Sequence, residues 1–262
     1  PPMRSVSTAS LLLAAALITG CASVPDSPPA KIRLGSVSMF SGNSAREGLP
    51  DGWQTWTLSR FKRPTEYRLV TDNGITVLRA RASSSASGLI HPLDLDPAQY
   101  RFLHWHWKVE ELIKGADNSR KSTEDSPVRV VVSFAGDLDK LSFDDRVFFD
   151  QVKAIAGQQL PYATLMYIWE NRAPKDSVIA NPHTSRIKMV VAESGRDKLG
   201  AWQTQTRDVY ADFKRAFGED PGRITAIAIL TDTDNTGENV HAYYGDIVFS
   251  QTSRMRAASA SE

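Results

Sequence analysis

The sequence contains one cysteine, Cys21, in 262 residues, so disulfide bonds do not hold this fold together. The sequence also lacks an excess of either charge, since 31 basic and 30 acidic residues give a net charge of +1. A near-neutral chain without a basic tail gives no indication of a nucleic-acid partner or of electrostatic attachment to a membrane. The chain is long enough for one folded domain whose core is held by apolar packing.

Several catalytic signatures are absent from the sequence. It has no Gly-x-Ser-x-Gly nucleophile motif, no glycine-rich phosphate loop and no His-Glu-x-x-His zinc motif. The single cysteine lies near the N-terminus, outside the region expected to fold. These absences favour a binding protein, and they leave open the enzymes that rely on carboxylates scattered along the chain.

The N-terminus has the pattern of a secretory signal. Arg4 is followed by an apolar run at residues 11–18, too short to span a membrane, and then by Thr19 and Gly20. Residues 18–21 resemble a bacterial lipobox, in which Cys21 becomes the lipidated first residue of the mature protein. The alternative is an ordinary signal peptide with a chance cysteine. We expect a signal peptide at residues 1–20 and a proline-containing tether at residues 21–37.

The residue after the cysteine bears on the destination of such a lipoprotein. Bacterial lipoproteins retained in the inner membrane usually carry aspartate there, whereas this sequence has Ala22. The resemblance therefore implies an outer-membrane lipoprotein, facing the periplasm or the surface, whose contact with the membrane is the N-terminal lipid.

Short strand signals separated by turns dominate residues 38–251. About ten segments alternate or are rich in β-branched and aromatic residues, and the Asp72-Asn73-Gly74 turn is a strong hairpin signal. Residues 128–134 are valine-rich, as expected of a strand buried on both faces. Only two helices are predicted, at residues 143–155 and 208–217. The pattern predicts a mostly β protein, an antiparallel β-sandwich with two helical insertions, followed by a disordered tail at residues 252–262.

Two resemblances support this fold class. The order of aromatic, Ser/Gly-rich and Trp-rich segments resembles the jelly-roll of galactose-binding-like carbohydrate-binding modules. A closer one spans about residues 38 to 250 and rests on several phrases in a fixed order: Pro161-Tyr-Ala-Thr-Leu-Met-Tyr-Ile-Trp169, Asn181-Pro-His-Thr184, Leu199-Gly-x-Trp202, Arg207-Asp-Val, Asp212-Phe213, Phe217-Gly218, Thr231-Asp-x-Asp-Asn-Thr236 and Tyr244-Gly-Asp246. These phrases resemble a family of exported bacterial proteins known as domain of unknown function 3047. The resemblance implies an envelope location and one β-rich domain, and it implies no chemistry.

Residues 231–249 (TDTDNTGENVHAYYGDIVF) concentrate oxygen-bearing side chains. They fit the first positions of an EF-hand calcium loop, but Tyr243 stands where that loop needs glutamate, and the flanks read as strands. A looser structural Ca²⁺ site stays open, with Asp232, Asp234 and Asn235 as ligands and Asp246 joining them from the last strand. The alternative is an Asx-rich turn whose side chains bond to their own backbone.

Aromatic side chains supply the candidate ligand-binding surface. Tyr167 and Trp169 share one face of a strand, and Trp202 could join them. Flat rings stack on the C–H-rich face of a sugar, while polar neighbours bind its hydroxyls. The polar residues expected beside this platform are Arg129, Glu170, Asn181 and His183. The alternative places the aromatic rings in the core of the sandwich.

The strand at residues 100–109 alternates in the same way. His104 and His106 share one face and Trp105 and Trp107 the other. The histidines are either a metal-binding pair or half-exposed polar residues on a strand whose tryptophans fill the core.

These observations predict a lipid-anchored cell-envelope protein that binds a glycan or another envelope component in an aromatic and polar groove, without catalysis. One alternative is an enzyme on the same groove. It would be a glycoside hydrolase with a carboxylate pair such as Glu170 and Asp232, or a polysaccharide lyase with Tyr167 as its base. A second alternative is a structural or assembly lipoprotein that binds another protein.

Overall fold

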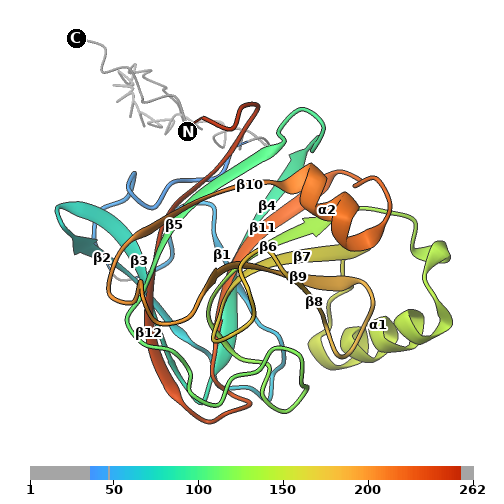
Figure 1. The fold of residues 1–262 in the computed structure, drawn as a ribbon, viewed down its shortest axis with the longest axis horizontal. Coiled ribbons are helices and arrows are strands. Elements are labelled where there is room, and N and C mark those ends of the chain that lie inside the picture. The colour runs from blue at the N-terminus through green and yellow to red at the C-terminus, as the bar shows by residue number, and fades with distance from the viewer. Residues whose placement is uncertain (1–35, 47, 255–262) are drawn as a thin grey trace, which may run out of the picture. The chain divides into compact units, whose positions relative to one another are not determined.

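The predicted strands lie in two sheets in the computed structural model, which describes residues 36–46 and 48–254 (Figure 1). The larger sheet contains, in spatial order, β1 (Gln54–Trp56), β4 (Ala86–Leu95), β11 (Ile224–Asp232), β6 (Ser126–Phe134), β7 (Ala163–Glu170), β9 (Ile187–Ser194) and β8 (Val178–Ala180). The smaller sheet contains β10 (Gln203–Asp208), β5 (Phe102–Val109), β12 (Asn239–Ser250), β3 (Ile75–Ser83) and β2 (Glu66–Asp72).

Neighbouring strands run antiparallel with one exception among the described residues. β7 and β9 are parallel, and the chain between them forms the short edge strand β8, which pairs antiparallel with β9. The prediction of a mostly β sandwich with two helices is confirmed. The edge strand β8 has only three residues and no alternating pattern, which is why the sequence gives no signal for it.

The core lies between the two sheets. All nine residues of β6 are buried, as the valine-rich run predicts. Val130 and Val132 belong to the core between the sheets, whereas Val131 packs in a second apolar cluster on the outer face of the larger sheet. On β5 the alternation places Trp105 and Trp107 in the core with no exposed surface. Because successive side chains of a strand point to opposite faces, the residues between them face outward.

The two helices begin and end within one residue of the predicted bounds. α1 (Phe143–Ala156) follows β6, and its N-cap is Ser142, whose side chain accepts a hydrogen bond from the backbone of Asp145. α2 (Val209–Phe217) follows β10 and is capped by Asp208. Each helix ends at a glycine in the left-handed region that disfavours other residues, Gly157 and Gly218 respectively. Among the described residues, no helix combines the length and the apolar character needed to cross a membrane.

Pro92 lies in β4 at a position that is both unpaired on one side and next to an irregularity on the other. β1 pairs with β4 only through Gly88, Leu89 and Ile90, so the β1 side is unpaired at Pro92. On the other side the pairing with β11 shifts register between Ile224 and Ala226. A residue without an N–H is tolerated there because no ladder hydrogen bond is lost.

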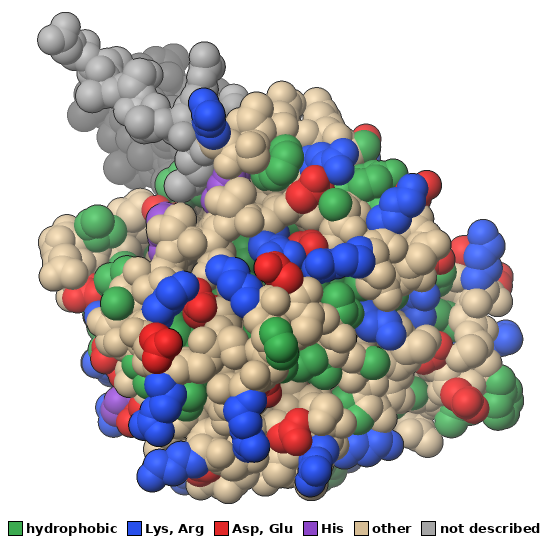
Figure 2. All heavy atoms as spheres, in the orientation of Figure 1, with side chains coloured by type: hydrophobic (Ala, Val, Ile, Leu, Met, Phe, Trp, Pro, Cys, Tyr) green, Lys and Arg blue, Asp and Glu red, His purple; other side chains and the backbone are tan. Residues whose placement is uncertain are grey.

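The signal peptide, Cys21 and all but the last residues of the tether lie outside the described residues, as do residues 255–262. The surface of the described part carries charges of both signs. On the face shown in Figure 2, basic and acidic side chains are interspersed, in keeping with the near-neutral composition.

Candidate ligand-binding site

The predicted platform of Tyr167 and Trp169 is wrong. Both rings are fully buried between the sheets. The Tyr167 hydroxyl donates to Asp212 at 3.0 Å, and the indole N–H of Trp169 donates to the carbonyl of Gly195 at 3.0 Å. Alternation on β7 correctly places the two rings on one face, but that face is the inner one.

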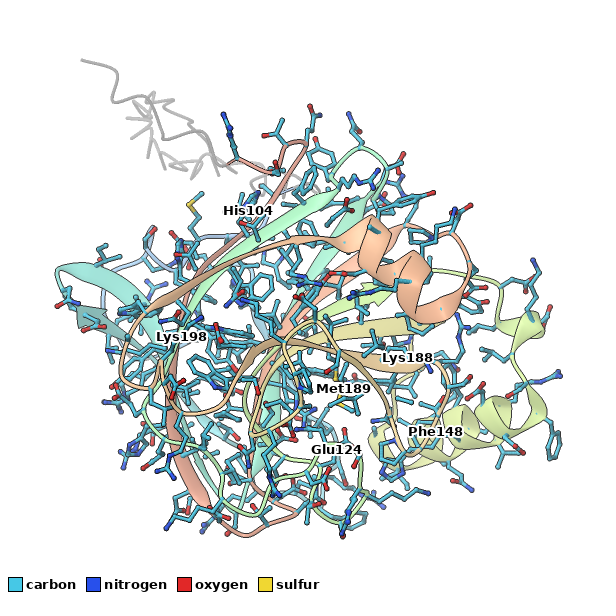
Figure 3. The ribbon with its side chains drawn as sticks, viewed as in Figure 1. His104, Glu124, Phe148, Lys188, Met189 and Lys198 are labelled. Atoms are coloured by element: carbon cyan, nitrogen blue, oxygen red, sulfur yellow. The ribbon has the colours of Figure 1, made fainter. Side chains whose placement is uncertain are left out.

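Arg129, expected to bind a ligand, is also buried, with 1% of its surface exposed. Its guanidinium donates to both carboxylate oxygens of Asp232, at 3.1 and 3.2 Å, and lies 3.6 Å from the Glu124 carboxylate. It also contacts the Met189 sulfur at 3.4 Å; Glu124 and Met189 are labelled in Figure 3. Its charge is therefore matched inside the protein and not available to a bound molecule.

The other polar residues of the predicted platform have separate roles. Glu170 is buried and accepts hydrogen bonds from the backbone of Arg172 and Ala173, closing the turn after β7. Asn181 donates to Glu124 at 3.0 Å. The exposed His183 ring stacks on Phe148 of α1 with 5.8 Å between ring centres. The structure does not bring these residues to one groove with Tyr167, so the groove that the alternative of a lyase with Tyr167 as its base requires does not form.

The acidic turn forms part of a carboxylate cluster that includes one residue the sequence does not indicate, Asp125. One carboxylate oxygen each of Asp125, Asp232 and Asp234 lies within 4.8 Å of the others. Asp234 pairs with Lys62 at 2.6 Å through Oδ2, while its Oδ1 is buried without a hydrogen-bond partner. Burial raises the pKa of Asp232 to about 6.

Asn235 and Asp246 do not complete this cluster as predicted. The Asn235 side-chain amide donates to the Asp125 carboxylate at 3.2 Å and to the backbone carbonyl of Glu124 at 3.1 Å, so it ties the turn to the segment before β6. Asp246 lies on β12 of the other sheet and accepts hydrogen bonds from the backbone N–H of Ser41, at 2.9 Å, and from its hydroxyl. The prediction that Asp246 joins Asp232 is therefore wrong, because the last strand carries it to a different face.

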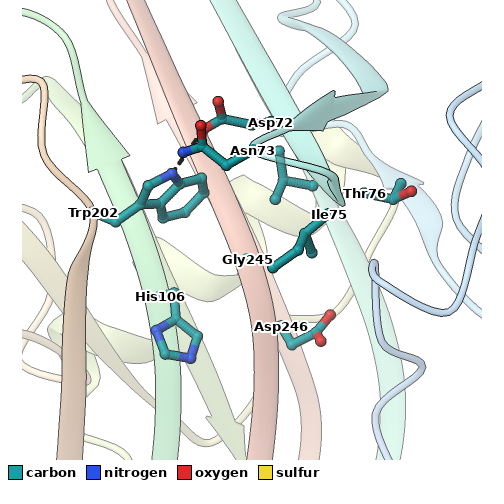
Figure 4. A pocket seen from close by; sticks show the side chains of 9 residues that line it. Asp72, Asn73, Ile75, Thr76, His106, Trp202, Gly245 and Asp246 are labelled. Carbon is teal, nitrogen blue, oxygen red and sulfur yellow. Dashed lines mark hydrogen bonds between the residues drawn. The ribbon is translucent and has the colours of Figure 1, made fainter.

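Asp246 and Trp202 meet instead in a cavity of about 310 Å³ on the outer face of the smaller sheet (Figure 4). All five strands of that sheet or their connections contribute. The described residues that line it, here called the Trp202 pocket, are Asp72, Asn73, Ile75, Thr76, Val77, His106, Trp202, Gly245 and Asp246. Its volume lies at the lower end of the range for small-molecule sites, roughly 300 to 1,000 Å³.

The half-buried Trp202 ring is held in place at the wall of this pocket. Its indole N–H donates to Oδ2 of Asp72 at 2.7 Å, and Lys108 donates to the same oxygen at 2.8 Å. The Lys108 ammonium also lies 5.5 Å from the centre of the Trp202 ring and 4.4 Å from that of Tyr243. These contacts fix the position of the ring before any ligand arrives.

The charges of this network stabilise one another. Hydrogen bonds from Lys108 and Trp202 lower the pKa of Asp72. Burial alone would lower the pKa of Lys108, but its hydrogen bond to Asp72 and the charges of Asp72 and Glu110 raise it. Both groups are therefore charged near neutral pH, and their pairing leaves the Asp246 carboxylate as the other charged group at the pocket wall.

Glycine is needed at one position of the pocket. The pairing of β12 with β5 shifts register between Tyr244 and Ile247, and Gly245 lies in this irregularity. A Cβ atom at Gly245 would come within 3.0 Å of the His106 Cβ and 3.5 Å of the Trp202 ring. The missing side chain thus lets the His106 side chain approach the backbone of β12 closely.

His106 supplies a polar atom to the wall, and the metal-pair alternative does not hold for it. Its Nδ1 is bonded to the Thr204 hydroxyl at 2.9 Å. His104 is buried and bonds to the side chains of Thr206 and Ser250. Each ring is thus held by hydroxyl groups of neighbouring strands. The alternative interpretation of the strand is correct for its tryptophans, which lie in the core, and for the half-buried His106, but His104 is buried and not half-exposed.

Two other hollows on the described surface suit a ligand less well. A depression of about 880 Å³ is lined by residues of both charges, including Glu110, Arg172, Arg196 and Glu238, and has no aromatic wall. A groove of about 130 Å³ beside α1 is lined mainly by apolar residues, Met166 among them. The Trp202 pocket differs from both because it combines an aromatic ring with carboxylates and an imidazole.

Comparison with known families agrees with the sequence. The family described as "Protein of unknown function (DUF3047)" matches residues 51–248. The match covers well over half of the chain, so the chain belongs to this family. No curated protein matches the sequence.

Two solved structures are similar over much of the chain. The glycoside hydrolase domain of Endo-D from Streptococcus pneumoniae R6 has a TM-score of 0.35 and 10% identity, with 77% of this chain and 22% of that chain covered. This chain thus spans about a fifth of that structure. "Cellulose induced protein, Cip1" has a TM-score of 0.35 and 10% identity, with 85% and 99% covered. Likenesses at these scores carry no information about ligand or activity.

Proposed function

We propose that this member of the DUF3047 family binds a sugar residue of a glycan in the Trp202 pocket, without catalysing a reaction. The observation that carries the proposal is the fixed, half-buried Trp202 ring at a cavity whose other walls include Asp72, His106 and Asp246. A flat indole matches the C–H-rich face of a pyranose ring. Carboxylate oxygens and an imidazole nitrogen accept hydrogen bonds from its hydroxyl groups.

The shape of the pocket supports a sugar more than a purely apolar ligand. Ile75, Val77 and Gly245 form apolar wall, while the polar atoms of Asp72 and Asp246 converge on the same cavity. Sites with this combination orient their ligand by a small number of polar contacts. The alternative of an enzyme on the same pocket rests on the two carboxylates, and analysis of reaction products after incubation with bound oligosaccharides distinguishes it.

We also propose that Cys21 is lipidated and that the protein is attached to the outer membrane through this lipid. The lipobox-like residues 18–21 and the alanine that follows support this part of the proposal. Labelling cells with a radioactive fatty acid tests it. A Cys21→Ser variant would carry no label and would leave the membrane fraction, whereas equal labelling of both proteins would contradict lipidation.

A glycan array probed with the purified protein tests the binding proposal. We expect binding to a subset of glycans and a loss of at least about tenfold in affinity for Trp202→Ala, as for other aromatic residues at the centre of a site. Trp56→Ala is the matched control, because Trp56 is also half-buried but lies on the larger sheet. Equal binding by Trp202→Ala and the wild type would contradict the proposal.

A further inference from the structure

The charges around the Trp202 pocket are unevenly distributed, and this bears on the kind of sugar that it takes. Its described lining contains two carboxylates, Asp72 and Asp246, and neither lysine nor arginine. Ammonium and hydroxyl groups are donors that suit such walls, whereas the carboxylate of an acidic sugar would meet like charges.

Lys108, the cation that pairs with Asp72, does not balance both carboxylates. It donates to Asp72 at 2.8 Å, lies 3.6 Å from Glu110 and contacts the Tyr243 ring. Arg79, on the same face of the sheet, pairs with Glu66 at 3.5 Å. It is not among the described residues that line the pocket. Asp246 therefore has the two hydrogen bonds from Ser41 but no ion pair among the described residues.

A bound sugar would change the surroundings of the Asp246 carboxylate. The carboxylate is partly exposed and lies among apolar walls that include Ile75 and Val77. A ligand that fills the cavity displaces water from this charge, which is unfavourable unless the ligand returns donors to it. An ammonium group returns both donors and an opposite charge, and the reduced water content strengthens the attraction.

We propose that the Trp202 pocket binds a sugar residue that carries a free amino group, with the ammonium directed at Asp246, a proposal that rests on the proposed function. Asp72 contributes acceptor capacity as well: Lys108 and Trp202 both donate to its Oδ2, and no described residue donates to its Oδ1. The pocket discriminates against uronic acids, because the carboxylate of a uronate would add a further negative charge beside Asp246.

Isothermal titration calorimetry with three tetrasaccharides tests this specificity. The probes are a β-1,4-linked glucosamine tetramer, its N-acetylated counterpart and a galacturonic acid tetramer, at about pH 6, where aspartate is ionised. We expect the glucosamine tetramer to bind about tenfold more tightly than the N-acetylated one, and the galacturonic acid tetramer to bind most weakly. Raising the salt concentration should reduce this preference.

The variant Asp246→Asn should lose the preference, because it keeps the shape of the side chain but removes its charge. Asp150→Asn on α1 makes the same change in net charge at an exposed position on the other side of the sandwich and should keep it. Tight binding of the galacturonic acid tetramer, or an unchanged preference in Asp246→Asn, would overturn the inference. If the N-acetylated or acidic tetramer binds best and Trp202→Ala abolishes that binding, the proposed function stands and the inference falls. If no tetramer binds, the inference falls, and the glycan array decides the proposed function.

Discussion

The indole N–H of Trp202 donates a 2.7 Å hydrogen bond to Oδ2 of Asp72, although the two residues are 130 positions apart. Asp72 closes the β2–β3 hairpin, while Trp202 immediately precedes β10 at the opposite edge of the same sheet. The bond therefore spans the outer face of the smaller sheet, and Lys108 on β5 shares the same acceptor oxygen. This hydrogen bond holds the Trp202 ring at the cavity wall, where packing in the hydrophobic core does not fix the ring.

Replacing Asp72 with alanine removes the acceptor that Trp202 and Lys108 share. We expect sugar affinity to fall about threefold to tenfold, because binding must then order a side chain that is ordered in advance in the wild type. Asp72→Asn is the control, since its carbonyl oxygen still accepts from Trp202. Titration calorimetry of both variants measures the effect, and wild-type affinity in Asp72→Ala would show that the ring needs no such support.

Replacing Gly245 with alanine places a methyl group where His106 and Trp202 approach the backbone. We expect sugar affinity to fall about threefold to tenfold with a smaller loss of stability, since the His106 side chain, whose Cβ would lie 3.0 Å from the new methyl group, must shift at the pocket wall. Gly115→Ala, outside the pocket and without a left-handed backbone, where the nearest neighbour of the new methyl group is the end of the Glu238 side chain at 3.3 Å, tests for general damage from an added methyl group. A variant at Gly245 with full affinity would mean that the ring positions do not matter.

Asp145 joins α1 to the loop before β9, and its contribution to stability should depend on pH. It accepts hydrogen bonds from Ser142, Thr184 and Ser185, and although burial opposes its charge, these bonds lower its pKa from 3.8 to about 2. Because the pKa in the folded state is lowered, the stabilisation is complete above about pH 4 and is lost as the pH falls towards about 2.

The lowered pKa of Asp145 also gives the size of the expected change in stability. We expect Asp145→Ala to lower the free energy of unfolding by about 2 kcal/mol near pH 7 and by much less near the lower end of that pH window. Asp144→Ala, at an exposed position in the same first turn, should cost less than about 1 kcal/mol. Urea titrations across this range test the prediction, and a deficit in Asp145→Ala independent of pH would contradict it.

The predicted calcium site at the acidic turn stays a prediction with a direct test. If the unpartnered Oδ1 of Asp234 binds a cation together with Asp125 and Asp232, millimolar Ca²⁺ should raise the melting temperature by about 3 °C and EDTA should reverse the rise. Protonation of Asp232, whose pKa is raised to about 6, would compete with the cation, so the rise should be larger at about pH 8 than at about pH 5.

The control for this test is Asp234→Asn, whose melting temperature should be the same with and without Ca²⁺. Equal melting temperatures of the wild type in Ca²⁺ and EDTA would mean that Arg129 and Lys62 are the only cations of the cluster, and the calcium prediction would be wrong.

Local patterns account for most of the fold. Alternation on β5, the valine-rich run of β6 and the glycines after both helices each depend on residues near one another in sequence. Sequence alternation alone does not tell which face of a strand points inward in a two-sheet protein. This is why the shared face of Tyr167 and Trp169 could be predicted, but not that it is buried.

The site depends on contacts that no local pattern carries. Trp202 could be nominated as an aromatic residue, and Asp246 as an acidic one, but Asp72 read only as part of a hairpin turn. Lys108 carried no signal beyond facing outward. These residues meet although β2 and β10 are opposite edges of one sheet, and a contact of this kind is a property of the whole chain.

The central claim is that a sugar binds against the Trp202 ring, and the indole N–H resonance of that residue reports on it most directly. In a two-dimensional ¹H–¹⁵N NMR titration with the glucosamine tetramer, with the peak assigned by its absence in Trp202→Phe, we predict a saturable shift of this resonance. The indole resonances of the buried Trp105 and Trp107 should stay in place. Saturable shifts elsewhere in the spectrum with an unmoved Trp202 resonance would contradict the account.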